Sequence, residues 1–296
     1  MGHRFRIVLP LPRGWATRWS REAGTPTPSA LFGGRACDRD TPLDSGGAGQ
    51  YIVVVASIRA VRRAEPFDSQ LSTRHPLMWP LARAARPFVD AGEWPAVSAW
   101  SAVFAADAAP PVEFVRAKPR PRGGARRRRT QSTIYDVSII ERGLVPSRER
   151  HWHDFFNALV WGTFPRAKVA LHRRQAAMLT ARLDAGAPRT LPPHRTREQD
   201  GLAMIDEGGV LALTTPGRAL HLVFGHAVYE GFVLGVPAMT ARTVRLPVVE
   251  WAADPIAQAD AALAAALADP AFSTLPDDLP RVFVPDEPLP PWMPPA

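Results

Sequence analysis

The sequence predicts an α+β fold, with helices packed on a small, mostly antiparallel sheet in a single mixed domain spanning residues 67–296. From Phe67 onward, segments with a helical spacing of apolar residues alternate with short β-branched segments. A hydrophobic content of 46%, including nine tryptophans among 296 residues, suffices for a packed core. Residues 1–66 show neither periodicity, so we expect the domain to follow them.

Six segments are expected to form helices. The last has the clearest boundary, because Asp254 can cap the first turn and Pro255 stands at the first helical position, where no N–H is needed. Pro165 separates two others. The predicted helices are Leu77–Val89, Trp94–Ala106, Arg150–Trp161, Arg166–Leu183, His221–Leu234 and Pro255–Ala268.

Short β-branched segments predict the strands. Gly208 and Gly209 suit a tight hairpin, because both central residues of a type I′ turn have positive φ. The proline-rich segment Leu275–Ala296 is expected to wrap over the surface. The predicted strands are Val112–Val115, Thr133–Ile140, Met204–Glu207, Val210–Thr214 and Thr243–Glu250.

Residues 1–66 are rich in Gly, Pro and Arg and are expected to be a disordered, low-complexity tail. We hypothesise that part of this tail is an over-extended gene start; an ordinary flexible tail is the alternative. We identify no signal peptide and no apolar run near the ~20 residues of a membrane span. Cys37 is the only cysteine, which fits a reducing compartment and favours the cytoplasm.

The net charge of +8 is unevenly distributed. The tail holds ten Arg against five acidic residues, and the segment 116–129 holds seven Arg and Lys118 with no acidic residue. The rest of the chain is therefore mildly acidic, which argues against nucleic-acid binding by the domain body. We predict an Arg-rich loop over residues 116–129, with at most a weak contact to nucleic acid through Arg126–Arg129.

The first polar cluster lies in the helix predicted over Arg150–Trp161. His153 and Asn157 are four residues apart and share a helix face, while Asp154 points about a quarter-turn away. A His-Asp doublet binds the metal of one large phosphohydrolase class, but that class is all-helical and this chain is mixed. A hydrogen-bonded structural pair is the alternative.

The second cluster contains Asp206 and Glu207 beside the predicted glycine turn. Either carboxylate could act as acid, base or metal ligand, although Asp before a turn also commonly bonds the turn backbone. Arg197 and Asp200, three residues apart, are most simply an ion pair that fixes a loop.

The third cluster places His226 and Glu230 four residues apart, the spacing by which a helix offers two ligands to one ion. A carboxylate that accepts from a buried imidazole N–H would satisfy both groups without a metal. Four other histidines stand in polar contexts and are expected at the surface: His151, His172, His194 and His221.

Three segments resemble a bacterial family known as domain of unknown function 3025. These are Trp152–Lys168, Asp206–Gly209 and Phe224–Glu230, within a resemblance that covers about residues 67–296. Two departures occur, namely Glu198-Gln199 before Asp200 and the absence of a Gly-Pro-Gly-like ending. The resemblance implies no activity. The hallmark positions that it implies are His153, Asp154, Asn157, Lys168, Asp206, Glu207, His226 and Glu230.

Together these patterns favour a metal-assisted hydrolase that acts on a small or phosphorylated substrate and uses a divalent metal ion. The alternative is a non-catalytic binding or scaffold module with a buried His/Asp/Glu hydrogen-bond network, in which the arginine loop contacts an acidic partner. The expected metal ligands are His153, Asp154, His226 and Glu230, the catalytic residues are His153, Asp154, Asp206 and Glu207, and the cofactor-binding residues are Asn157, Lys168 and Arg197.

Overall fold

The structure is a computed structural model that describes residues 66–70, 76–106, 109–117, 135–181, 195–236 and 239–284. All of them fall in one compact unit, Ser57–Ala296. The described residues form helices and two sheets, which confirms the predicted α+β class. The helices are α4 (Ala82–Ala85), α5 (Tyr135–Arg142), α6 (Trp152–Thr163), α7 (Pro165–Ala181), α8 (Arg197–Gly208), α9 (His226–Val233) and α10 (Pro255–Ala268), with 3-10 helices at Pro76–Leu81, Arg86–Phe88, Val97–Val103 and Pro276–Asp278.

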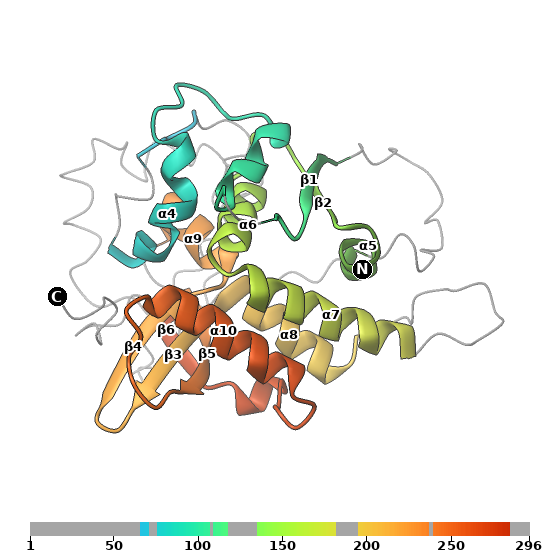
Figure 1. The fold of residues 1–296 in the computed structure, drawn as a ribbon, viewed down its shortest axis with the longest axis vertical. Helices are drawn as coiled ribbons and strands as arrows, with labels where there is room; N and C mark the ends of the chain where they lie inside the picture. Colours follow the sequence, from blue (N-terminus) through green and yellow to red (C-terminus); the bar gives the residue numbers. More distant parts are fainter. Residues whose placement is uncertain are drawn as a thin grey trace, which may run out of the picture. The chain divides into compact units, whose positions relative to one another are not determined.

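The C-terminal part of the described chain forms a four-stranded sheet in the order β4-β3-β5-β6. The two outer pairs are antiparallel and the β3–β5 pair is parallel, so the sheet is mostly antiparallel, as predicted. Figure 1 shows α10 lying across β3 and β5, with α7 beside it. The strands are β3 (Gly209–Thr215), β4 (Arg218–Val223), β5 (Met239–Pro247) and β6 (Arg281–Val284).

A second, smaller sheet pairs β1 (Glu113–Arg116) with β2 (Leu144–Ser147) in parallel. Helix α5 lies between β1 and β2 in the sequence, and parallel strands need a long connection of this kind, which usually contains a helix. Phe114 and Val145 are register partners, and both are buried in the main hydrophobic core.

Local signals in the sequence define several helix ends. Thr196 and Gln199 form a capping box at the start of α8, and Asp254 accepts from the first N–H groups of α10. At the start of α7, the buried Asp260 of α10 accepts from the backbone N–H groups of Arg166 and Ala167. This last contact joins two helices that are distant in the sequence.

Aromatic side chains fill the core around α6. Trp152 and Phe155 of this helix contact Phe67 and Trp94, with ring centroids between 4.4 and 6.1 Å apart. Trp161, near the C-terminal end of α6, is also fully buried. The packing fixes α6 firmly against the N-terminal part of the described chain, and it thereby fixes the polar side chains that α6 carries.

The predicted hairpin at Gly208-Gly209 is wrong. Residues 204–207 belong to α8, because the capping box starts a helix that continues to Gly208. The observed hairpin joins β3 to β4, and its turn contains Gly217 with φ of 77°. Glycine there avoids the strain that a side chain would suffer at positive φ.

One other predicted element is wrong in type, and one predicted helix starts five residues later than expected. The segment predicted as the strand Thr133–Ile140 lies within α5 from Tyr135 onward, where Val137 and Ile140 pack with residues of α7. This packing outweighs the β-propensity of its side chains. The helix predicted from His221 instead starts at His226, because the preceding residues pair with β3 as β4.

The remaining predictions are confirmed with changes of detail. The first two predicted helices are mainly 3-10 helices, the first interrupted by a single turn of α4. The strands β1, β3 and β5 and the helices α6, α7 and α10 are at the predicted places within a few residues. Strand β6 lies in the segment Leu275–Ala296, which was predicted to wrap over the surface and for which no strand was expected.

Several predictions fall outside the described residues. They concern nearly all of the tail over residues 1–66, most of the Arg-rich loop over residues 116–129, and residues 285–296. Within the part of the chain that the structure describes, no helix combines the length and the apolar character that a membrane span requires.

Candidate metal centre

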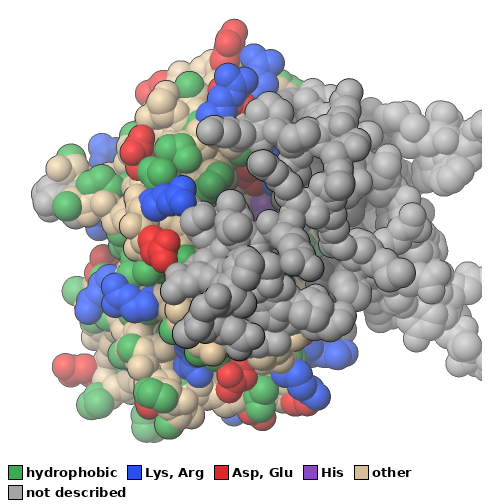
Figure 2. All heavy atoms as spheres, turned by 90° about the vertical axis from the view of Figure 1, so that its right-hand side faces the viewer, with side chains coloured by type: hydrophobic (Ala, Val, Ile, Leu, Met, Phe, Trp, Pro, Cys, Tyr) green, Lys and Arg blue, Asp and Glu red, His purple; other side chains and the backbone are tan. Residues whose placement is uncertain are grey.

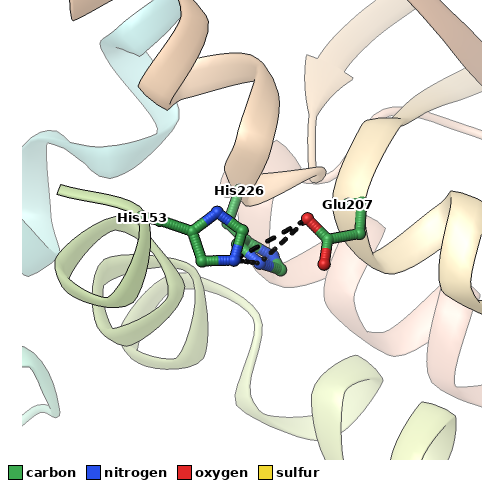
Figure 3. Close-up of side chains that lie close together, drawn as sticks. All are labelled: His153, Glu207 and His226. Atoms are coloured by element: carbon green, nitrogen blue, oxygen red, sulfur yellow. Dashed lines mark hydrogen bonds and ion pairs between the residues drawn. The ribbon is translucent and has the colours of Figure 1, made fainter. Parts of the chain in front are cut away.

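Three side chains from three helices come together, and one nitrogen or oxygen atom of each lies within 4.8 Å of the other two (Figure 3). His153 comes from the first turn of α6, Glu207 from the last turn of α8 and His226 from the first position of α9. The two Nε2 atoms of the histidines lie 3.1 Å apart. The Oε2 atom of Glu207 lies 3.4 Å from Nε2 of His226 and 3.8 Å from Nε2 of His153.

The β3–β4 hairpin explains why Glu207 and His226 meet. Helix α8 runs directly into β3, and α9 follows β4 after two residues, so the antiparallel pairing of the strands brings the end of one helix to the start of the other. Gly225 permits the close approach, because a Cβ atom at this position would lie 2.5 Å from the carbonyl oxygen of Glu207. The N–H of Gly225 donates to the carbonyl of Gly209.

His226 is held in one orientation by the end of α8. Its Nδ1 lies 2.8 Å from the backbone carbonyl oxygen of Asp206, and since a carbonyl only accepts, Nδ1 carries the hydrogen. Burial lowers the pKa of His226 to about 3, so the ring is neutral near pH 7. The lone pair of Nε2 therefore points at His153 and Glu207.

His153 is oriented in the same way by a carboxylate. Its Nδ1 lies 3.1 Å from Oε2 of Glu230, a buried residue one turn along α9 from His226. Burial opposes a positive charge on His153, but the hydrogen bond to Glu230 and the charge of Glu207 together raise its pKa. With Nδ1 donating to Glu230, Nε2 of His153 also faces the centre.

Two imidazole lone pairs at 3.1 Å repel each other unless a proton or a cation lies between them. Tetrahedral zinc with Zn–N bonds of about 2.0–2.1 Å would place two ligand nitrogens about 3.3 Å apart. The three observed separations, from 3.1 to 3.8 Å, are close to this value. Two imidazoles and one carboxylate are a donor set typical of zinc and of other transition ions rather than of Mg²⁺ or Ca²⁺.

A buried polar chain lies next to this group. Nζ of Lys168 donates to Oδ1 of Asp206 at 2.5 Å and to Oδ1 of Asn157 at 2.8 Å. The Nδ2 group of Asn157 donates in turn to the hydroxyl oxygen of Tyr135. Burial acts to raise the pKa of Asp206, but the charge of Lys168 and its hydrogen bond outweigh burial and hold that pKa well below its usual range. Asp206 is therefore ionised.

Two of the residues expected at a site lie apart from the three-residue group. Asp154 accepts from the backbone N–H, Nε and Nη2 of Arg148 at 2.6–2.8 Å, which turns its carboxylate toward the segment before α6. Arg197 is exposed and pairs with Asp277, not with Asp200 as the spacing had suggested.

The structure also shows polar partners that the sequence did not indicate. Arg148 and Tyr135 were not expected to contact the clusters, since both lie outside the helix that carries Asp154 and Asn157 and no helical spacing links them to it. Two of the four histidines expected at the surface, His151 and His172, are buried. Nδ1 of His172 donates to the Asp136 carboxylate at 2.8 Å, and the ring stacks on Trp161, whose ring centroid is 5.3 Å away.

The centre is reached from outside through Glu207, whose side chain is 51% exposed, whereas that of His226 is only 4% exposed. Figure 2 shows acidic and basic side chains mixed among hydrophobic ones over the described part of one face. On that part, no large area of a single charge is visible. An extended nucleic-acid groove, which would require clustered basic residues, gains no support from this face.

Comparison with known proteins gives a single result. The family model described as "Protein of unknown function (DUF3025)" matches residues 125–222, which include His153, Lys168 and Glu207. His226 and Glu230 lie beyond the matched residues, so the resemblance there stays a prediction. Neither the search of curated proteins nor the search of solved structures found a match.

Proposed function

We propose that this chain, which matches the DUF3025 family model over residues 125–222 and joins two histidines to a glutamate, is a metal-dependent hydrolase. His153, His226 and Glu207 are its metal ligands, and a small or phosphorylated molecule is its substrate. The observation that carries the proposal is the 3.1 Å contact between two Nε2 atoms whose rings are both anchored through Nδ1.

The anchoring of both rings supports a metal more than a structural role. Histidine ligands in metal sites usually donate their other N–H to a carboxylate or a backbone carbonyl, and this fixes the tautomer and direction of the ring. Here Glu230 holds His153 and the carbonyl of Asp206 holds His226. The protein thus fixes the two donor atoms before any ion arrives.

Three protein ligands leave at least one coordination position for water, as catalytic zinc sites do. A divalent ion lowers the pKa of its bound water and polarises a carbonyl or phosphoryl oxygen. In the hydrolysis, the water oxygen forms a bond to the electrophilic carbon or phosphorus as the bond to the leaving group breaks, and the proton from water ends on the leaving group. Glu207, which is half exposed, lies where a substrate would approach.

Metal analysis of the purified protein tests this proposal. After incubation with Zn²⁺, Mn²⁺ or Co²⁺ and removal of free ion, the wild type should retain about one ion per chain, and His226→Ala should retain none. His221→Ala, which removes an imidazole from β4, is the matched control and should bind like the wild type. A wild-type protein that retains no ion removes the proposal.

Hydrolysis is tested separately with p-nitrophenyl phosphate and p-nitrophenyl acetate. Activity that requires the added ion and is absent from His226→Ala supports the enzyme. Metal binding without hydrolysis of any ester tested would favour the alternative, a non-catalytic module. The buried chain of Lys168, Asp206 and Asn157 is the observation behind that alternative, because it provides a satisfied hydrogen-bond network without any metal. A location in the cytoplasm remains a prediction from the single cysteine.

A further inference from the structure

Lys168 is a charged side chain with an exposed fraction of 0%. Its ammonium group contacts Asp206 and Asn157 and lies 5.4 Å from the ring centre of Trp161. Burying an ion pair carries a desolvation cost that often exceeds the attraction between its charges, so the pair is weak evidence for stability. Its position suggests another role.

Asp206, the partner of Lys168, is linked to two of the proposed metal ligands. Its backbone carbonyl accepts from Nδ1 of His226, and it is the residue directly before Glu207 in the last turn of α8. The same carboxylate that binds Lys168 lies 4.0 Å from Nδ1 of His226. A shift of this turn would therefore move two donor atoms together.

We infer that Lys168 is a positioning residue of the metal centre. From α7 it holds the side chain of Asp206, and this fixes the end of α8, the carbonyl that orients His226 and the backbone that carries Glu207. Asn157 of α6 supports the ammonium from the helix that carries His153, so one cation ties together the helices of two ligands and the carbonyl that orients the third. The inference rests on the proposed metal centre.

Co²⁺ binding to Lys168→Met tests this role. We expect the dissociation constant to rise about 10- to 100-fold, as for other outer partners of metal ligands, and the visible Co²⁺ spectrum to change. Val145→Ala is the control for lost stability, because it removes two methyl groups from the core in β2, on the other sheet. It should be less stable than the wild type but bind Co²⁺ with the same spectrum.

The double variant Lys168→Met/Asp206→Asn guards against misfolding of the single variant. It removes both charges, so no unpaired carboxylate stays buried and stability should recover. The hydrogen bond from Lys168 of α7 to residue 206 is still missing, so Co²⁺ affinity should stay low. If affinity returns to the wild-type value together with stability, or if Lys168→Met binds Co²⁺ normally, the inference is overturned.

A measurement without metal separates this inference from the metal proposal. In the metal-free wild type, the Nδ1–H of His226 should give a protected imidazole NMR signal, because it is buried against the Asp206 carbonyl. Lys168→Met should lose that signal and Val145→Ala should keep it. If the wild type shows the signal but binds no Co²⁺, only the metal function is refuted. If the signal is unchanged in Lys168→Met, the positioning role is refuted.

Discussion

The Nε2 atoms of His153 and His226 face each other at 3.1 Å across residues that are 73 positions apart in the chain. Glu230 and the Asp206 carbonyl occupy the two Nδ1 positions, so the two Nε2 atoms need a proton or a metal ion between them. The contact therefore marks the point where a shared cation would lie, and the predictions below follow from its surroundings.

Glu230→Gln should weaken metal binding without abolishing it. Glutamine can still accept from Nδ1 of His153 but lacks the charge that strengthens the hydrogen bond. We expect a loss of about 10- to 100-fold in affinity, against complete loss for His226→Ala. Competition titration with a zinc-sensitive dye measures both. Equal losses in the two variants would mean that Glu230 is itself a ligand.

Asp154→Asn should leave metal affinity nearly unchanged and should lower stability. Its carboxylate is engaged by the Arg148 guanidinium, which together with a backbone N–H holds the pKa of Asp154 below its usual range despite burial. A hydrogen bond to a charged group contributes about 1.5–3 kcal/mol. Urea unfolding and metal titration on the same preparation check the two parts. A large loss of metal affinity would mean that Asp154 is a metal ligand, as the sequence had predicted from its position next to His153.

Gly225→Ala should disrupt the junction between α8 and α9. The added methyl group would lie 2.5 Å from backbone atoms of Glu207 and Gly208, which cannot move aside as a flexible side chain could. Overpacking of this kind typically costs about 1–3 kcal/mol, and here it should also weaken metal binding.

Gly208→Ala is the matched control for that junction, because a Cβ atom there meets nothing within 4 Å. It should change stability by no more than about 0.5 kcal/mol and keep the metal. If Gly225→Ala behaves like this control in thermal unfolding, the close approach of the two helices is not as described.

Asp260 should make stability depend on pH in an unusual direction. Burial raises its pKa to about 6, although the N–H groups of Arg166 and Ala167 oppose the shift. Between about pH 4 and 6 the folded protein thus binds more protons at this group than the unfolded chain, whose carboxyl has a pKa of about 3.9. Its contribution to stability is full below pH 4 and falls as pH rises through 6.

Asp260→Asn removes this titration and retains an acceptor for the N–H of Ala167. From pH 4 to 6.5 the wild type should therefore lose more stability, or gain less, than the variant, by up to about 3 kcal/mol. Urea unfolding of both proteins at the two pH values gives the difference. Parallel pH profiles would show that the carboxyl of Asp260 titrates normally in the folded protein.

The sequence by itself determined the α+β class, the α6–α7 pair broken at Pro165, the capped α10, and the residues His153, Glu207 and His226 as functional candidates. These are local signals, since caps, prolines and ionisable residues in apolar surroundings act within one or two turns of the chain. The elements predicted wrongly, α5 and the end of α8, are those where packing and a cap further back in the chain outweigh the side chains in the segment.

Only the tertiary structure decided how the candidates combine. It placed Glu207 opposite the two histidines, turned Asp154 toward Arg148, and made Glu230 the partner of His153. The i,i+4 spacing of His226 and Glu230 is compatible with two ligands of one ion. It is equally compatible with one ligand and a carboxylate that orients a different ligand, His153. Two contacts decide between these roles: the β3–β4 pairing, which joins α8 to α9, and the packing of α6 against α9. These contacts between distant segments set the direction in which each donor atom points.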